Sequence, residues 1–214
     1  MRILISAIFL TAALFGQSPA PIGIFDGHGD VGNPERAGSA DFDAVSQSYR
    51  VTGAGVNMWD KIDQLQFLWK KISGGAAITA EIRFPEMSTT PHRKAVLMFR
   101  QTMETGSPYV DVAVHGSGLT SLQFRESTDQ ITRSVRFPIA GPSWVRLVRR
   151  GTEYTLFTST NGKLFQEAGA IQMKMADPVY VGIGMCSHNP KMLETAVFSG
   201  VSIQPLSAPA AKKK

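Results

Sequence analysis

The feature that most constrains the fold of this chain is the recurrence of short apolar segments along most of its length. From residue 45 onward, segments rich in Val, Ile, Thr and Phe recur at intervals of roughly ten residues, with turn residues between them. No segment of ordinary helix length stands out. This rhythm predicts an all-β fold, a sandwich or a barrel of antiparallel strands. The expected strands are 48–56, 65–69, 76–83, 94–100, 109–115, 120–126, 132–137, 144–149, 153–159, 179–185 and 195–203.

Two hairpins are specified more sharply than the rest of the fold. The first turn lies at residues 150–153 and contains Gly151. The second lies at 160–163 and contains Asn161-Gly162, the pair that favours a type I′ turn. Together they predict three consecutive strands in an antiparallel meander. Residues 60–68 are compatible with a helical turn or with the start of a strand, and the aromatic residues that follow favour the strand.

Length and charge exclude several classes of protein. The 214 residues fit one domain of ordinary size, and 43% hydrophobic with 18% charged residues excludes a disordered chain and a polytopic membrane protein. The formal charge is +5, but removing four of the 22 basic residues, Arg2 and Lys212 to Lys214, leaves 18 against 17 acidic ones. A nucleic-acid binder needs a basic face, so no nucleic acid is expected as a partner.

The N-terminus has the form of a secretory signal peptide. Met1 and Arg2 precede an apolar run at 3–15, and small and polar residues follow at 16–20. A membrane anchor is the alternative, but the run is shorter than the roughly 20 residues that span a bilayer. We expect a signal peptide at 1–20, one domain at 21–205 and a flexible basic tail at 206–214, with a secreted or periplasmic location and no transmembrane span in the mature chain. Cys186 is the only cysteine and is expected to be a buried thiol.

Eight phrases, taken in order, carry a resemblance to a known family. They lie at 29–32, 49–55, 57–60, 94–100, 123–125, 144–151, 159–162 and 180–188. In these phrases the chain resembles the DUF1349 family, which is related to the yeast protein called regulation of enolase 1. The resemblance implies a concanavalin A-like jelly-roll sandwich and an association with secreted carbohydrate-related proteins. Asn57 departs from the family, where an acidic residue commonly precedes the Trp-Asp pair, and this weakens an ion site carried over from it.

The sequence offers little support for catalysis. Residues 27–32 match G-x-G-x-x-G but lead into Asn33-Pro34 rather than a helix, so a glycine-rich loop is expected there. Glycoside hydrolysis needs two facing carboxyl groups, and no strand carries alternating acids of that kind. The four histidines are scattered singly, unlike most zinc ligands. No cofactor is expected, and calcium is a candidate ion because four aspartates stand in expected loops: Asp26, Asp30, Asp60 and Asp63.

The resemblance places one set of polar and aromatic residues at matching family positions. Its members are Trp59, Asp60, Asp63, Arg100, Arg125 and His188. A sugar site needs an aromatic face and planar hydrogen-bonding groups, so this set is the candidate ligand site of a secreted, non-catalytic, lectin-like module that binds glycan. A buried tryptophan and a structural Arg–Asp pair are the alternative. A structural or protein-interaction domain is the competing function, and a glycan-active enzyme is the third.

Overall fold

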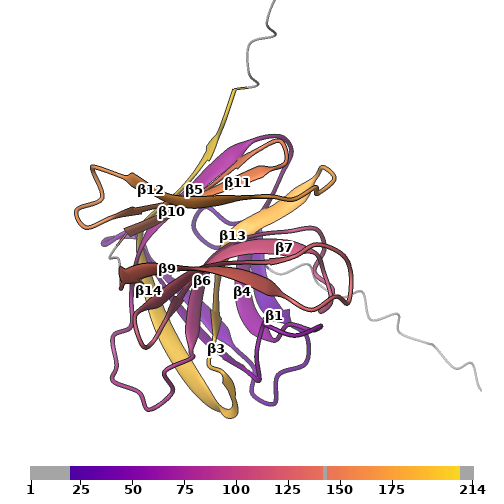
Figure 1. Ribbon diagram of the computed structural model, residues 1–214. Coiled ribbons are helices and arrows are strands. Elements are labelled where there is room, and N and C mark those ends of the chain that lie inside the picture. Colours follow the sequence, from indigo (N-terminus) through magenta and orange to yellow (C-terminus); the bar gives the residue numbers. More distant parts are fainter. Residues whose placement is uncertain (1–19, 142–143, 208–214) are drawn as a thin grey trace, which may run out of the picture.

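The chain folds into two antiparallel β-sheets, which lie as two layers in Figure 1. The computed structural model describes residues 20–141 and 144–207. Within these ranges the regular elements are all strands. They are β1 (Gly27–Val31), β2 (Ser39–Asp43), β3 (Ser48–Gly55), β4 (Leu65–Ile72), β5 (Ala76–Arg83), β6 (Lys94–Arg100), β7 (Tyr109–His115), β8 (Leu119–Arg125), β9 (Arg133–Ala140), β10 (Trp144–Arg150), β11 (Glu153–Ser159), β12 (Gln166–Gln172), β13 (Val179–Cys186) and β14 (Asn189–Pro205).

Each sheet contains seven strands. We call them sheet I, in the order β1-β4-β13-β6-β7-β8-β9, and sheet II, in the order β12-β11-β10-β5-β14-β3-β2. The last two strands of the chain occupy interior positions, since β13 lies between β4 and β6 while β14 lies between β5 and β3. The all-β sandwich expected from the sequence is therefore confirmed.

The main hydrophobic core lies between the sheets because alternate residues of each strand point inward. On sheet I, Leu97 pairs with Val112 and Val112 with Leu122, so these three side chains share the inner face. On sheet II, Ile78 pairs with Leu147 and Leu147 with Leu156. All six are fully buried in one cluster. This layer fixes the register of both sheets, because a slip of one residue would turn every apolar side chain outward.

A glycine lets the two sheets approach each other closely at one side. Gly53 of β3 lies in sheet II, and a Cβ atom at this position would be 2.1 Å from the carbonyl oxygen of Met185 in β13 of sheet I. No side chain fits at that distance without backbone movement. The glycine therefore lets β3 of sheet II lie close to β13 of sheet I, and this sets the separation of the two sheets there.

The expected strands that were named agree with the structure to within a few residues, except that β14 begins earlier. Three strands were not predicted: β1, β2 and β12. Residues 27–31 form β1 rather than the glycine-rich loop expected, with Gly29 opposite Phe67. All three are edge strands that are mainly polar or contain glycine, and the side chains of β12 that face the core are only partly buried. Their strand geometry comes from pairing with a neighbour, which local composition does not report.

Both predicted hairpins form, but the second turn differs from the prediction. Strands β10 and β11 are joined by Gly151 and Thr152 as expected, and β10-β11-β12 make the meander. Between β11 and β12, however, only Gly162 has a positive φ, 69°, whereas a type I′ turn needs two such residues. The Asn161 side chain instead accepts hydrogen bonds from the amides of Lys163 and Leu164. The expected type I′ turn is replaced by a longer loop built around an asparagine turn.

The expected signal peptide at 1–20 lies almost wholly outside the described residues, as does most of the basic tail at 206–214. Over the described ranges, no helix is long and apolar enough to cross a bilayer. Cys186 is fully buried, as expected.

Removing one central core side chain tests this packing. Leu97→Ala is expected to lower the free energy of unfolding by about 2–5 kcal/mol, because it deletes a fully buried side chain between the sheets. Urea denaturation followed by tryptophan fluorescence measures this change. Leu164→Ala is the control, since Leu164 is 78% exposed and its loss is expected to change stability by less than about 0.5 kcal/mol. Equal effects of the two substitutions would contradict the assigned core.

Candidate functional site

The outer face of sheet I carries polar side chains in rows across four strands. Residues directly opposite each other in antiparallel strands share a face. Lys94 of β6 lies opposite His115 of β7. Farther along the sheet, Asp111 of β7 lies opposite Gln123 of β8, which lies opposite Ser134 of β9. The sheet itself therefore gathers groups that are far apart in the chain.

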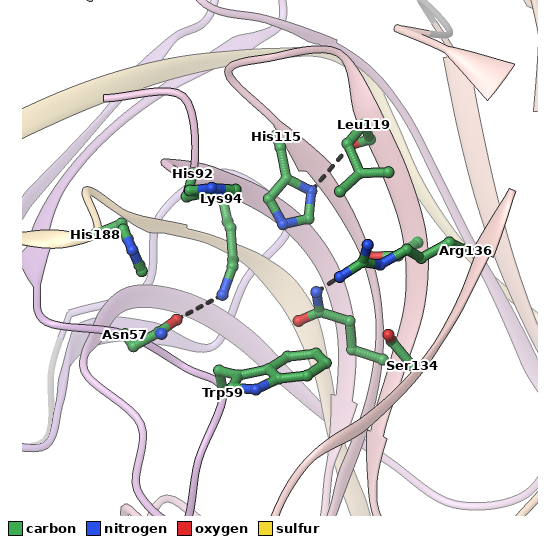
Figure 2. Close-up of a pocket in the computed structure, with 11 residues that line it drawn as sticks. Asn57, Trp59, His92, Lys94, His115, Leu119, Ser134, Arg136 and His188 are labelled. Atoms are coloured by element: carbon green, nitrogen blue, oxygen red, sulfur yellow. Dashed lines mark hydrogen bonds between the residues drawn. The ribbon is translucent and has the colours of Figure 1, made fainter. Parts of the chain in front are cut away.

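These rows form the floor of a cavity of about 260 Å³. Figure 2 shows Trp59, His115 and Arg136 facing the hollow from different sides. This volume is near the lower end of the range of ligand sites, roughly 300–1,000 Å³, and suits a ligand of about one sugar ring. The lining residues are Asn57, Trp59, His92, Lys94, His115, Leu119, Ser121, Gln123, Ser134, Arg136 and His188.

One wall comes from the loop at 56–64, between β3 and β4. This loop carries Asn57 and Trp59 to the cavity. It folds back on itself through a bridge between Met58 and Asp63 and a hydrogen bond from the Gln64 amide to the Asn57 carbonyl, 2.8 Å. These contacts give the loop a defined structure, and the loop holds the indole of Trp59 over the sheet.

A buried ion pair fastens this loop. Asp63 and Arg125 are both 0% exposed, and the guanidinium binds both carboxylate oxygens at 2.7 and 2.9 Å. The same guanidinium donates to the carbonyl oxygens of Asp60, Ser107 and Gln130, at 2.9 to 3.0 Å. These bonds offset the cost of burying two charges and tie three loops to the end of β8.

A second arginine completes the cluster. Arg100 is also fully buried, and its Nη2 lies 3.4 Å from Oδ2 of Asp63. It donates to the carbonyl oxygens of Thr102 and Glu104, each at 2.7 Å. Desolvation lowers the pKa of this guanidinium from its usual value, and the charge of Asp63 partly offsets the shift. The cluster places two arginines on one carboxylate, so the surrounding carbonyl oxygens are needed to satisfy the donors.

The six residues of the predicted ligand site divide between two places. Trp59 and His188 line the cavity. Asp63, Arg100 and Arg125 lie beneath the surface in the ion-pair cluster, with no exposed area. The sixth, Asp60, has an exposed side chain and contributes its carbonyl oxygen to Arg125. The role of these six residues in binding stays a prediction. In the structure, the three buried residues contact one another beneath the loop at 56–64 and do not line the cavity.

His188 reaches the cavity from an unusual backbone conformation. It lies two residues after the end of β13, and its φ is 58°, in the left-handed region that few residues other than glycine adopt. This geometry turns the chain between β13 and β14. Burial lowers the pKa of its imidazole, with smaller contributions from Lys94 and His92.

Lys94 is the basic side chain in the floor of the cavity. It is only 3% exposed, yet its ammonium group makes a hydrogen bond of 2.5 Å to Oδ1 of Asn57 and lies 5.9 Å from the centre of the Trp59 ring. Burial lowers the pKa of this ammonium from its usual value. Asn57 thus contacts the lysine as a neutral acceptor.

Three imidazoles lie together beside this lysine. The rings of His92 and His115 are 6.2 Å apart, and those of His92 and His188 are 5.4 Å apart. His115 is nearly buried, and its Nδ1 lies 2.9 Å from the carbonyl oxygen of Leu119, which requires Nδ1 to carry the hydrogen atom. Burial is the main cause that lowers the pKa of His115 from 6.5 to about 4.

Several polar atoms at the floor have no partner within the described part of the chain. Both carboxylate oxygens of Asp111 lack one, as do Oε1 of Gln123 and Nδ1 of His188. Asp111 is 0% exposed, and burial raises the pKa of its carboxyl group well above the usual value. The Nε2 group of Gln123 donates to Ser121 at 3.1 Å, which leaves its oxygen as an available acceptor.

No group of three or more His, Cys, Asp or Glu residues in the described ranges is arranged to hold a metal ion. The four aspartates considered for calcium lie in separate environments. Asp26 pairs with Lys70 at 3.1 Å, Asp30 accepts the amide of Gly38 at 2.9 Å, and Asp63 binds Arg125. Calcium binding stays an untested prediction.

Sequence reasoning missed most of the cavity lining, although a signal for it exists. Ser121 and Gln123 are two residues apart in β8, and Ser134 and Arg136 are two residues apart in β9. Polar residues at period two in neighbouring strands predict a polar sheet face. What the sequence does not report is that Lys94 and His115 pair beside them, because that depends on strand order.

Comparison with known proteins establishes the fold but not a family. No family model matches the chain, and no curated protein matches it. The resemblance to DUF1349 is therefore not shown. Solved structures do match, at sequence identities that carry the fold alone.

Three of these structures show the architecture. A functionally unknown protein from Saccharomyces cerevisiae has a TM-score of 0.63 and 15% identity, over 84% of this chain and 97% of that one. Carbohydrate binding module CBM66 from Bacillus subtilis has a TM-score of 0.55 and 12% identity, over 86% and 99%. Lectin II from Ulex europaeus has a TM-score of 0.52 and 9% identity, over 79% and 91%. The chain thus has the concanavalin A-like jelly-roll sandwich of lectins and carbohydrate-binding modules.

The ion-pair cluster is tested by removing one charge. Arg125→Met leaves Asp63 buried beside a more distant arginine, and we expect the free energy of unfolding to fall by about 3–5 kcal/mol. Arg50→Met is the matched control, because its pair with Glu86 is about half exposed and is expected to contribute at most about 1 kcal/mol. Chemical denaturation measures both. A loss below about 1 kcal/mol for Arg125→Met would contradict the structural role.

His115 predicts an acid limit of stability. Its pKa is lower in the folded chain, about 4, than the usual 6.5, so the unfolded chain binds a proton more readily between these values. The contribution of His115 to the free energy of unfolding is complete above pH 6.5 and is lost as the pH falls toward 4. The loss is up to about 3 kcal/mol, at 1.36 kcal/mol per pKa unit. Urea denaturation at a series of pH values measures this loss, and His115→Gln is expected to reduce the pH dependence. An unchanged dependence in that variant would assign the effect to other groups.

Proposed function

We propose that the protein is a non-catalytic carbohydrate-binding module and that the cavity on the outer face of sheet I is its sugar site. The observation that carries the proposal is the position of Trp59, which stands over a floor of hydrogen-bonding side chains. A pyranose ring has an apolar face and a rim of hydroxyl groups, so it needs an aromatic surface and polar groups together.

The donors and acceptors around the cavity suit a ring of hydroxyl groups. Asn57 and Gln123 supply amides, Ser121 and Ser134 supply hydroxyls, and His188 supplies an imidazole nitrogen that has no partner among the described residues. Most of these groups lie on strands or next to a strand end. A site held by a sheet is preorganised, so binding costs little ordering.

The lining favours binding over hydrolysis. Glycoside hydrolysis uses two carboxyl groups about 5 to 10 Å apart, whereas the described residues that line the cavity are neutral or basic. The lectin and carbohydrate-binding module with the same fold support a binding role. Export from the cell, with cleavage after residue 20, belongs to the same proposal, because free glycans and glycan surfaces lie outside the cytoplasm.

A glycan panel tests the proposal. The purified protein is screened against immobilised glycans with and without calcium, and saturable binding to a related set is expected. Trp59→Ala is expected to weaken binding about tenfold or more, since it removes the stacking surface. Trp69→Ala is the matched control, because Trp69 lies on the same sheet in β4 but does not line the cavity.

The outcomes separate the alternatives. Equal loss in both tryptophan variants would place the site elsewhere on the sheet. If the folded protein binds none of the glycans on the panel, this would contradict sugar binding and favour a structural or protein-interaction domain. A requirement for calcium would settle the question left by the four aspartates.

A further inference from the structure

We propose that the cavity selects an acidic sugar, one whose ring carries a carboxylate or sulfate group, and that Lys94 and Arg136 bind that group. This inference rests on the proposed sugar site and specifies its ligand. The cavity has two basic side chains, Lys94 and Arg136, and three imidazoles in its lining, and the described lining residues include no carboxylate.

The first step of the argument is the state of Lys94. An ammonium group has three hydrogens to donate, and this one has a single hydrogen-bond partner in the described structure, Oδ1 of Asn57. It forms no ion pair within 4 Å there, although it is 3% exposed. A nearly buried cation that keeps donors unused is costly, and an anionic ligand beside it would offset that cost.

Arg136 supplies the second cation from the opposite wall. It stands on β9 two residues from Ser134, is exposed, and forms no ion pair with a described carboxylate. Figure 2 shows its guanidinium directed toward the hollow, across from Trp59. A guanidinium binds a carboxylate or sulfate through two parallel hydrogen bonds, so this side chain suits an anionic substituent on a sugar stacked against the indole.

The nearest acid of the same face does not cancel this charge at the surface. Asp111 is completely buried beneath the floor, and its oxygens have no hydrogen-bond partner in the described chain. Burial raises the pKa of its carboxyl group well above the usual value, and the charge of Lys94 partly opposes this shift. The surface of the cavity therefore presents positive charge, even though the chain without its termini is nearly neutral.

Two neighbouring atoms without partners indicate a sugar rather than a bare sulfate. Oε1 of Gln123 and Nδ1 of His188 are buried and lack partners in the described structure, and both residues line the cavity. Sulfate only accepts hydrogen bonds, so it offers nothing to the amide oxygen of Gln123. A sugar hydroxyl both donates and accepts, so it can pair with the Gln123 oxygen and with the His188 nitrogen in either tautomer.

The test compares sugars that differ only in charge. Binding to the purified full chain is measured by calorimetry with trisaccharides of glucuronate, galacturonate and mannuronate, each beside its carboxyl-reduced counterpart, and with a 6-sulfated galactose trisaccharide. At least one acidic trisaccharide is expected to bind about tenfold or more tightly than its neutral counterpart. Whether the carboxylate or the sulfate binds best identifies the natural substituent.

Two variants locate the charge recognition. Arg136→Gln is expected to weaken binding of the acidic trisaccharide more than binding of its neutral counterpart, and so to remove most of the preference for the acidic sugar. Arg133→Gln is the matched control. It removes the same charge from the same strand, but Arg133 is three residues from Arg136 and does not line the cavity. Equal effects of the two substitutions would mean that the preference comes from the overall charge of the protein, and would overturn the assignment of Arg136 to the acidic group.

The remaining outcomes keep this inference distinct from the proposed function. If neutral trisaccharides bind the cavity as tightly as acidic ones, the sugar site stands and the acidic specificity falls. If inorganic sulfate at equal ionic strength competes as well as the acidic sugar, the site is an anion site only, and the inference also falls. If no sugar of either kind binds, both proposals fail together.

Discussion

The buried carboxylate of Asp63 is the interaction on which the cavity depends. It is bound by both nitrogens of the Arg125 fork and approached by Arg100, and all three side chains are withdrawn from solvent. A buried ion pair of this kind contributes little net stability compared with an apolar substitute. What it provides here is position, because the partners come from the loop at 56–64 and from the ends of β6 and β8.

The consequence for the cavity is a fixed wall. Carbonyl oxygens of neighbouring loops satisfy the remaining arginine donors, so the loop cannot move without leaving charged groups unpaired. Trp59 lies in the same loop, four residues from the carboxylate. The aromatic surface that the proposed sugar site needs is thus held by electrostatics beneath the sheet edge, while the polar floor is held by strand pairing.

Much of the fold could be predicted from the sequence, and less of the site. The strands around Leu97, Val112 and Leu147 have buried apolar faces, so their composition reports them directly. Strand β12 contains Gln, Glu, Gly, Ala and Ile, and none of its side chains is fully buried, so only its pairing with β11 identifies it as a strand. Asp63 and Arg125 belong to the polar set that the sequence singles out, but a sequence cannot distinguish a carboxylate that binds a ligand from one that binds an arginine of the same chain. Lys94, His115 and Arg136 converge only because β6, β7, β8 and β9 are neighbours, which is long-range information.

The placement of the last two strands bears on how the chain acquires its structure. Strand β13 separates β4 from β6, and β14 separates β3 from β5, so both sheets lack an interior strand until residues 179–205 are present. Pairings of such large sequence separation are slow to form. A growing chain therefore cannot complete either sheet until β13 and β14 have been synthesised. Until then the apolar strands of both sheets lack their neighbours, and unpaired apolar strands are prone to pair with other chains.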